Sequence, residues 1–191
     1  MIKVTQRFNG NRDWLYKNQH NIFFFGFIDL LNHLKNILPT DSKMIEIGSY
    51  MGESTMLFCS THIFSEVNVI EPHSGDEAFN KLFGYAWDDV INEFNNNTKK
   101  FSDILKIYKG YSYEYVNGFK DYSYDFIYID GSHEKNNIER DLQQYISKVK
   151  KGGYIGGHDY HEEWPDVVEV VDRVVGKPDL IFEDSSWIKA V

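Results

Sequence analysis

Cysteine and proline are scarce in this sequence, and each scarcity excludes a class of protein. Cys59 is the only cysteine among the 191 residues, so a scaffold of intramolecular disulfides is excluded. Four prolines and a hydrophobic fraction of 42% exclude a collagen-like or disordered chain. The composition is that of a folded domain suited to a reducing compartment, so a cytoplasmic location is expected.

The sequence also lacks a long hydrophobic run. Its most apolar window, Ile22 to Leu31, is interrupted by Asp29 and is far shorter than the roughly 20 residues that span a bilayer. Residues 1–10 carry no apolar core like that of a secretory signal. We therefore expect no membrane among the partners of this chain.

Basic residues are fewer than acidic residues in this sequence. The 20 lysines and arginines are outnumbered by 29 aspartates and glutamates, which leaves a formal net charge of −9. A surface field of that sign repels phosphate backbones. Nucleic acid is therefore not expected as a partner.

The chain shows no internal repeat and no linker rich in proline, glycine or serine. Its length fits one domain, and we predict a single domain over residues 1–191, with an N-terminal helical extension over 1–40 and an α/β core over 41–191. Apolar residues spaced by three and four predict a helix from Asn21 to Leu38. Its apolar face is expected to pack in the core or against a second copy of the chain, as in a homo-oligomer.

After residue 40, short apolar runs alternate with amphipathic segments. Such alternation predicts an α/β fold, with a doubly wound, mostly parallel sheet and helices on both faces. Ligands of such sheets bind outside the carboxyl ends of the strands. Strands are expected at 43–48, 67–71, 104–109, 125–130, 153–158, 180–183 and 187–191, and helices at 53–64, 87–94, 112–119, 137–149 and 165–175.

The first predicted strand runs into a turn bracketed by Gly48 and Gly52. Glycines at such a turn allow a ligand to approach the backbone, and the following helix offers free N–H donors. Ser54 and Thr55 add hydroxyl groups in the first turn of that helix. An ordinary tight turn that caps a helix is the alternative interpretation.

Glu71 stands at the end of the second predicted strand, 19 residues after Gly52. An acid at this spacing accepts hydrogen bonds from the ribose of a bound nucleoside. The turn lacks the G-x-G-x-x-G pattern of dinucleotide-binding proteins, which counts against a nucleotide-dependent oxidoreductase. The combination of turn and acid favours a nucleoside ligand over a surface glutamate.

Two further strands also end in polar clusters. Asp130 and His133 follow one of them, and His158 and Asp159 follow the next. Because these strands are expected side by side, Asp130, His158 and Asp159 could converge as ligands of a divalent cation, with His133 close by. The alternative is that the two aspartates cap helices and that His158 is a core histidine.

These residues resemble a known family. Glu46-x-Gly48-x-x-x-Gly52, Glu71 and the runs 125–133 and 152–160 are similar to class I S-adenosylmethionine-dependent methyltransferases. The closer resemblance is to methyltransferase family 24, near macrolide-sugar O-methyltransferases and the so-called cephalosporin hydroxylases. It covers about residues 40 to 160 and implies a Rossmann-like, seven-stranded sheet with a reversed last strand.

The resemblance implies S-adenosylmethionine as the cofactor. Gly48 and Gly52 would lie beneath its methionine part, Glu46 would orient its amino group, and Glu71 would hold the ribose. The segment from Gly110 to Ser112 would border the adenine. The implied cofactor-binding residues are Glu46, Gly48, Ser49, Gly52, Ser54, Thr55, Glu71, Ser112 and Asp130.

The resemblance also implies a catalytic centre. In metal-dependent relatives, the positions of Asp130, His158 and Asp159 bind a divalent cation such as Mg²⁺, and the position of His133 is the general base. His133 and Asp130 are therefore the implied catalytic residues. The sequence departs from the family at Tyr50, which replaces the middle glycine of the turn, and at His158, where relatives often carry a carboxylate.

Together these features predict O-methylation of a small-molecule or sugar hydroxyl, with a cation and a histidine base. A nucleotide-dependent oxidoreductase and a non-catalytic binding or assembly module remain the alternatives.

Overall fold

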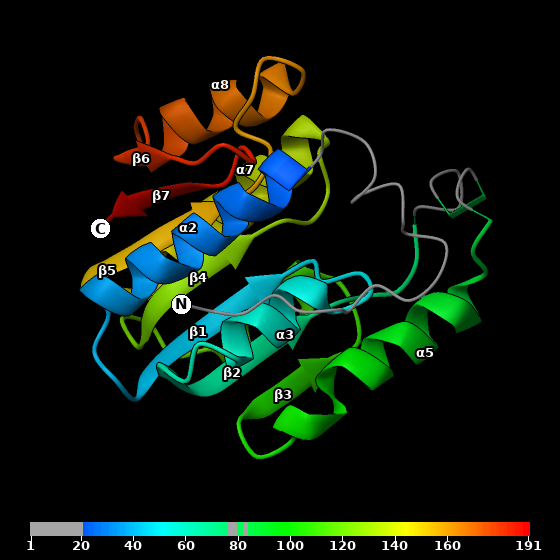
Figure 1. Ribbon diagram of the computed structural model, residues 1–191. Helices are drawn as coiled ribbons and strands as arrows, with labels where there is room; N and C mark the ends of the chain where they lie inside the picture. The colour runs from blue at the N-terminus through cyan, green and yellow to red at the C-terminus, as the bar shows by residue number, and fades with distance from the viewer. Residues whose placement is uncertain (1–20, 76–79, 82–83) are drawn as a thin grey trace.

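The computed structural model describes residues 21–75, 80–81 and 84–191. At its centre lies a seven-stranded sheet in the order β3-β2-β1-β4-β5-β7-β6 (Figure 1). The strands are β1 (Ser42–Ile47), β2 (Phe64–Ile70), β3 (Leu105–Tyr108), β4 (Tyr124–Ile129), β5 (Val149–Gly157), β6 (Leu180–Ile181) and β7 (Trp187–Ala190).

The first five strands are parallel to their neighbours, whereas β7 runs antiparallel to both β5 and β6. The expected fold class, including the reversed last strand, is confirmed. The carboxyl ends of β1, β4 and β5 lie next to one another, so residues that follow these strands meet at one edge of the sheet.

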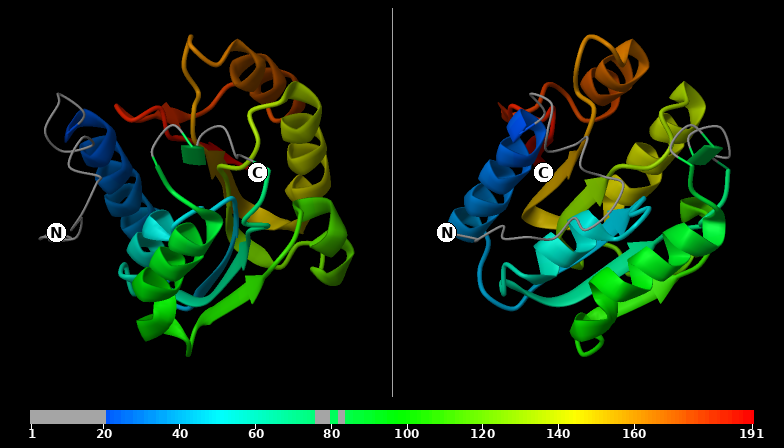
Figure 2. Two further views of the ribbon diagram at one scale, coloured as in Figure 1. Left: turned by 90° about the vertical axis from the view of Figure 1, so that its right-hand side faces the viewer. Right: turned by 45° about the vertical axis from the view of Figure 1, so that its right-hand side comes forward.

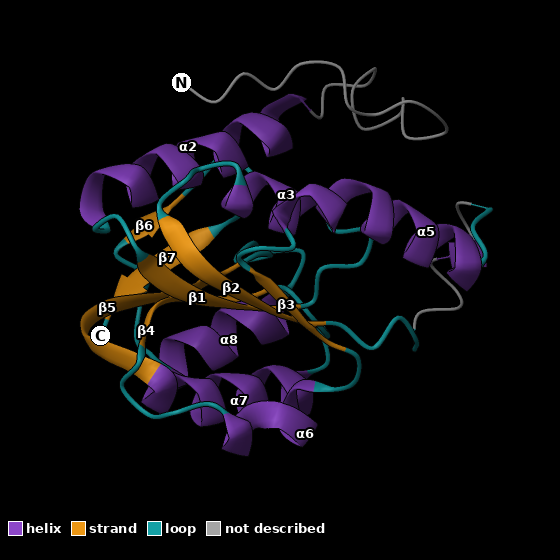
Figure 3. Cartoon of the chain, turned by 90° about the horizontal axis from the view of Figure 1, so that it is seen from below, coloured by secondary structure: helices purple, strands orange, loops and turns teal. Residues whose placement is uncertain are grey.

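Helices cover both faces of the sheet (Figures 2 and 3). One layer holds α2 (Asn21–Ile37), α3 (Glu53–Cys59) and α5 (Trp87–Thr98), and the other holds α6 (Ser112–Tyr115), α7 (Lys135–Tyr145) and α8 (Pro165–Val174). Short 3-10 turns follow α5, α6 and α7 at Lys99–Phe101, Val116–Gly118 and Ile146–Lys148. In the described part of the chain, no helix combines the length and apolarity needed to cross a bilayer.

Side chains alternate between the two faces of each strand, which divides the core in two. Phe126 and Tyr128 of β4 belong to the cluster formed with α2 and α3. Ile127 and Ile129 of the same strand belong to the cluster formed with α7 and α8. All six residues of β4 are buried, as expected for a central strand covered on both faces.

The apolar face of α2 packs in the core. Leu30, Leu31 and Leu34 have no exposed surface and contact the same cluster as Phe126 and Tyr128. Of the two expectations for this helix, the described residues therefore support core packing, and this face is not available to a second copy of the chain.

The helix expected over 53–64 is shorter than predicted. It ends at Cys59, and the next backbone contacts, Thr61 N–H to the Phe58 carbonyl and His62 N–H to the Cys59 carbonyl, have the three-residue spacing of a tight turn. His62 then adopts a φ of 60°, a left-handed conformation that stops a helix. Phe64 consequently opens β2 instead of closing α3.

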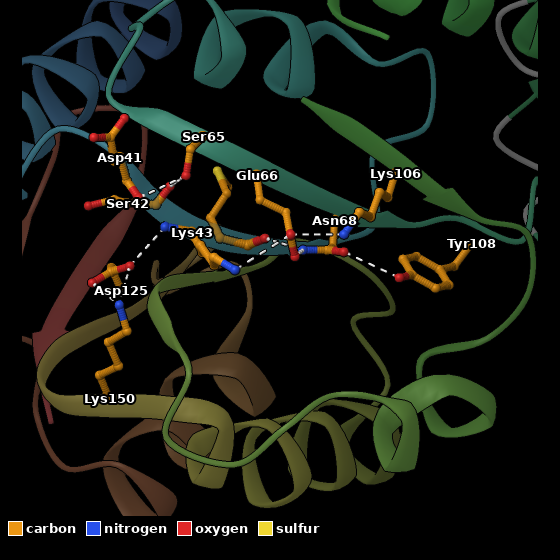
Figure 4. A network of polar contacts seen from close by, with 11 residues as sticks. Asp41, Ser42, Lys43, Ser65, Glu66, Asn68, Lys106, Tyr108, Asp125 and Lys150 are labelled. Atoms are coloured by element: carbon orange, nitrogen blue, oxygen red, sulfur yellow. Dashed lines mark hydrogen bonds and ion pairs between the residues drawn. The ribbon is translucent and has the colours of Figure 1, made fainter. Parts of the chain in front are cut away.

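Ion pairs connect the strands at the amino edge of the sheet (Figure 4). Glu66 of β2 accepts Lys106 of β3 at 2.8 Å and lies 3.7 Å from Lys43 of β1. Asp125 of β4 accepts the Lys43 amide at 2.8 Å and Lys150 of β5 at 2.8 Å. The lysines of these pairs are about half exposed, and such pairs contribute about 0–1 kcal/mol each, so they add little to the stability of the sheet.

Candidate active site

The turn after β1 needs its two glycines for contacts within the protein. Gly48 has a φ of 81°, and a Cβ there would lie 2.1 Å from the carbonyl oxygen of Asp130. Gly52 has a φ of 73°, and its Cβ would lie 2.9 Å from the ring of Phe94 in α5. Close contact with the backbone after β4 explains Gly48, and close contact with side chains of α5 explains Gly52, beside the ligand approach that the sequence suggests.

Glu71 organises this turn from the neighbouring strand. Its Oε2 accepts the backbone N–H groups of Ser49 and Tyr50 at 2.8 and 2.7 Å, and its Oε1 accepts that of His73 at 2.7 Å. A carboxylate offers about four acceptor positions. The three backbone contacts leave one position on Oε1 for a ligand hydroxyl.

Ser49 carries an unpaired polar atom. Its hydroxyl oxygen is buried and, among the described residues, is one of the few buried side-chain atoms with no hydrogen-bond partner. Such atoms are rare in folded proteins, and a ligand or ion is one recognised reason for them. The turn thus offers a polar group where the resemblance places the cofactor.

Tyr50 adopts a φ of 48° at the position where the family pattern has glycine. Its hydroxyl donates to Asn80 Oδ1 at 2.6 Å, and its ring packs edge-on against Trp87 with centroids 6.4 Å apart. The left-handed conformation disfavours a side chain, and these contacts anchor it. The bulk of tyrosine is accommodated by the segments after β2 rather than by a wider turn.

Glu46 lies fully buried at the end of β1. It accepts hydrogen bonds from Ser54 Oγ and Thr55 Oγ1, both at 2.5 Å. The two hydroxyl protons therefore point to Glu46, and only the hydroxyl oxygens remain as acceptors for a ligand. Burial raises the pKa of Glu46 to about 8, although these two hydrogen bonds oppose the rise.

Glu46 should make the stability of the protein pH-dependent. Its folded pKa of about 8 exceeds the ordinary value of 4.5, so the folded state holds the proton more tightly. Its contribution to the free energy of unfolding is complete below pH 4.5 and is lost as the pH rises to about 8. Between these pH values, the wild type should lose about 3–5 kcal/mol more of its free energy of unfolding than Glu46→Gln does, at about 1.4 kcal/mol per pKa unit.

Urea denaturation of both proteins at pH 5 and pH 8.5 measures this difference. Glu66→Gln is the control, because the pKa of Glu66 lies below its ordinary value and its carboxylate is already ionised at pH 5. Equal losses of stability in the wild type and Glu46→Gln would contradict the assignment.

Ser112, expected near the adenine, is hydrogen-bonded to two residues of α7. Its hydroxyl donates to Asp141 in a short hydrogen bond, and its carbonyl accepts the Tyr145 hydroxyl at 2.7 Å. The hydroxyl is buried with Asp141. A cofactor contact from Ser112 would therefore come from its backbone or require this bond to break.

The carboxyl ends of β4 and β5 bring together Asp130, His133 and Asp159. One ligand atom from each lies within 4.8 Å of the other two, and within the described ranges no other trio of acids, histidines and cysteine is grouped in this way. His133 Nε2 lies 2.6 Å from Asp159 Oδ2. The cluster adjoins the turn after β1, because the Asp130 carbonyl lies under Gly48.

His158, expected as the third metal ligand, takes a different position. Its Nδ1 lies 3.1 Å from Asp159 Oδ1, and its Nε2 lies 3.7 Å from Asp184 Oδ2. Both ring nitrogens thus face carboxylates, and His133 replaces His158 in the cluster. The sequence places His158 correctly at the strand end but cannot give the direction of its ring.

The charges of this cluster shift its pKa values in different directions. Burial raises the pKa of Asp130 to about 7. The hydrogen bond that His133 donates to Asp159 raises the pKa of His133. Burial opposes ionisation of Asp159, but hydrogen bonds from His133 and His158 hold its pKa far below the ordinary range. Burial also opposes protonation of His158, yet Asp159, Asp130 and Asp184 raise its pKa to about 9.

A pocket opens beside the cluster, between α7 and α8. Its polar side is formed by Asp130, His133, His158 and Asp159, together with Ser132 and Gly131. Its apolar wall comes from α7, α8 and the sheet: Ile129, Ile138, Leu142, Val167, Val171 and Trp187. These apolar residues are at most 9% exposed and belong to the core. The pocket is therefore a small hollow above the core, and its polar residues are the ones that a ligand group would meet.

Comparison with known proteins identifies the family. Residues 45–160 match the family model described as a methyltransferase domain, that of methyltransferase family 24. The chain belongs to this family. It is thereby a class I S-adenosylmethionine-dependent methyltransferase, as the sequence resemblance implied. The match includes Glu46, Glu71 and the Asp130 cluster.

Individual relatives are distant. The methyltransferase is 27% identical to an uncharacterized protein of Acanthamoeba polyphaga mimivirus over 85% of this chain and 72% of the relative. An O-methyltransferase from Bacillus cereus, solved with SAH (S-adenosylhomocysteine), has a TM-score of 0.62 at 14% identity, covering 98% of this chain and 93% of that one.

Two further structures share the fold. A TDP-rhamnose 3'-O-methyltransferase of calicheamicin biosynthesis has a TM-score of 0.59 at 12% identity, covering 94% of this chain and 84% of that one. Spermidine synthase from Thermotoga maritima has a TM-score of 0.59 at 16% identity over 86% of this chain. The methyltransferase spans only 58% of the length of that synthase.

Sequence reasoning missed two residues of the site. Trp164, 41% exposed, stacks on the His133 ring with centroids 4.2 Å apart and planes at 23°. Asp184, in the turn between β6 and β7, faces His158. Both lie beyond residue 160, where the family match ends, and neither stands in a motif. The Trp164-Pro165 helix start was visible, but not its contact with His133.

Proposed function

We propose that this methyltransferase transfers a methyl group to a hydroxyl oxygen of a small molecule or sugar. The observation that carries the proposal is the 2.6 Å contact between His133 and Asp159 at the rim of the pocket. A hydroxyl is protonated at neutral pH and attacks poorly, so a positioned base is the group that such an acceptor needs. The two O-methyltransferases with the same fold support oxygen as the acceptor atom.

His133 would act as the general base. When its Nε2 carries a proton and donates to Asp159, the opposite nitrogen, Nδ1, is the free acceptor. Nδ1 would then take the proton of the acceptor hydroxyl. The bound cofactor would supply the methyl group, and its sulfur would keep the electron pair of the broken carbon–sulfur bond as the leaving thioether. Asp159 fixes the ring and stabilises the resulting imidazolium, in the manner of a carboxylate–histidine pair.

The residues in and beside the turn after β1 suit S-adenosylmethionine as the cofactor. When bound, S-adenosylmethionine supplies a methyl group that its sulfonium makes electrophilic. Ser49 Oγ offers an unpaired polar atom, and Glu71 keeps one acceptor position on Oε1 for a ribose hydroxyl. Gly48, Gly52 and Glu46 shape the turn, and Ser54 and Thr55 act on it through Glu46.

A divalent cation is the second candidate for the cluster, because Asp130, His133 and Asp159 supply three donor atoms close together. An ion held there would lower the pKa of the acceptor hydroxyl. The mixed oxygen and nitrogen donors suit Mn²⁺ or Zn²⁺ better than Mg²⁺, which prefers oxygen alone. Activity lost to EDTA and restored by one of these ions would assign the cluster to a metal instead of a free base.

Ligand-induced stabilisation tests the cofactor. S-Adenosylhomocysteine at 100 times its dissociation constant should raise the free energy of unfolding by about 2.7 kcal/mol. NAD at the same concentration should leave the melting temperature unchanged. A shift with NAD alone would indicate an oxidoreductase, and no shift with either ligand would favour the binding-module alternative.

Labelled S-adenosylmethionine with a panel of sugars and aromatic alcohols then tests the reaction. We expect a product methylated on oxygen. Transfer to amines and to none of the hydroxyl compounds would overturn the proposed acceptor class.

A further inference from the structure

Two ionisable side chains near the proposed base, His158 and Asp184, have no role in the mechanism proposed above. From the pocket inward, His133 contacts Asp159 at 2.6 Å, Asp159 contacts His158 at 3.1 Å, and His158 lies 3.7 Å from Asp184. Histidine and carboxylate alternate along this row. The side chains are 40% exposed at His133, 16% at Asp159, 23% at His158 and 1% at Asp184, so Asp184 is the buried end of the row.

Asp184 is fixed from several sides. Its Oδ2 accepts the Ser186 hydroxyl at 2.7 Å, and its Oδ1 accepts the Ser186 amide at 3.1 Å. Ser186 Oγ in turn lies 3.2 Å from the hydroxyl of Tyr128 in β4. From α2, Gly26 approaches so closely that a Cβ there would lie 2.2 Å from the Asp184 nitrogen.

The same turn is joined to the strand end that carries Asp159. The Tyr160 amide donates to the Ser185 carbonyl at 3.1 Å. Asp159 and Ser185 both adopt left-handed conformations, with φ of 61° and 67°. Non-glycine residues keep such conformations only where their surroundings enforce them, and they are common at functional sites.

Stability alone is a poor reason for this arrangement. Removing a carboxylate from water costs several kcal/mol, and buried ion pairs are often no more stable than apolar residues of the same size. Asp184 nevertheless keeps a charge-bearing group 1% exposed behind the pocket. Its ionic contact is directed at His158, whose other nitrogen holds Asp159.

We propose that Asp184 is a positioning residue for the methyl-transfer site, acting through His158. The carboxylate of Asp184, 3.7 Å from Nε2 of His158, orients that ring by its charge, and Nδ1 of His158 contacts Oδ1 of Asp159 at 3.1 Å. The other oxygen of Asp159 therefore stays directed at His133. The inference rests on the proposed base role of His133, and it makes His158 an orienting group rather than a cation ligand.

Proton NMR of the ring N–H of His133 tests this positioning without an acceptor. In the wild type, the proton shared with Asp159 should give a low-field resonance, assigned by its loss in His133→Gln. Asp184→Asn keeps the shape of the side chain but removes its charge, and it should broaden or shift this resonance. Asp179→Asn is the matched control, because Asp179 is an exposed carboxylate of the same hairpin that contacts Lys189.

Kinetics with an acceptor that the labelling panel identifies provide the second readout. We expect Asp184→Asn to lower kcat about tenfold or more, as for other groups that orient a catalytic residue, with unchanged affinity for S-adenosylhomocysteine. Asp179→Asn should match the wild type. If Asp184→Asn does not fold, His158→Asn, which cannot hold both carboxylates as histidine does, should give the same two effects.

The outcomes separate this inference from the proposed function. An unchanged His133 resonance in Asp184→Asn and His158→Asn overturns the positioning role, whether or not activity is found. Loss of activity in His133→Ala together with normal kcat in Asp184→Asn overturns the positioning role of Asp184 and leaves the proposed function intact. A changed resonance in a protein with no methyl-transfer activity supports the positioning and contradicts only the proposed function.

Discussion

Replacing His133 with alanine should lower kcat for methyl transfer by about 10²–10⁴-fold, the usual contribution of a general base. His133 lines the pocket, and Asp159 orients its ring through a contact of 2.6 Å, the shortest between a histidine and a carboxylate at the site. Without it, the acceptor hydroxyl loses the base that we propose for it. Affinity for S-adenosylhomocysteine should change little, because His133 lies outside the turn assigned to the cofactor.

His161→Ala is the matched control for this variant. His161 lies in the neighbouring loop, between β5 and α8, which also carries Asp159. Its side chain is 52% exposed, and the carboxylate of Glu163 is 3.9 Å away. Calorimetry measures the affinity for S-adenosylhomocysteine, and initial rates with an acceptor from the labelling panel measure kcat. Near-normal kcat in His133→Ala would remove the base from the mechanism.

Replacing Gly48 with alanine should have the largest effect on stability. Its φ of 81° disfavours any side chain, and the added Cβ would lie 2.1 Å from the Asp130 carbonyl oxygen and 2.7 Å from Gly131 Cα. The left-handed conformation costs about 1–2 kcal/mol and the overlap about 1–3 kcal/mol more. Such a loss is a large part of the about 5–15 kcal/mol that stabilises a domain.

Gly176→Ala separates the two contributions. Gly176 has a φ of 83°, close to that of Gly48, but a Cβ there would meet no atom within 4 Å. Urea denaturation should therefore show a loss of only about 1–2 kcal/mol for Gly176→Ala. Equal losses for the two variants would mean that the close approach of Gly48 to β4 is unimportant.

Much of the fold could be predicted from the order of apolar runs. The runs that end at Ile47, Ile70 and Ile129 became neighbouring parallel strands, because a strand buried on both faces needs consecutive apolar residues. Boundaries were less predictable. Phe64 fits the apolar stripe of a helix as well as a buried strand, and the backbone turn at His62 decided between them.

The positions of the site residues could also be predicted, but not the directions of their side chains. Asp130, His133 and Asp159 were expected at neighbouring strand ends and lie together there. Ser54 and Thr55 were expected to face a ligand, yet both donate to Glu46, because a buried carboxylate requires hydrogen-bond donors. Asp184 could not be found at all, since its partner lies 26 residues away across the sheet.

By itself, the sequence determined the class of the fold and the strand ends at which polar residues gather, because periodicity and turn residues act over a few neighbouring positions. The tertiary structure decided which nitrogen of each histidine meets which carboxylate. It paired His133 with Asp159, and it turned His158 toward Asp184. Those contacts join segments far apart in the chain, and the place of β5 between β4 and β7 in the sheet sets the distances between them.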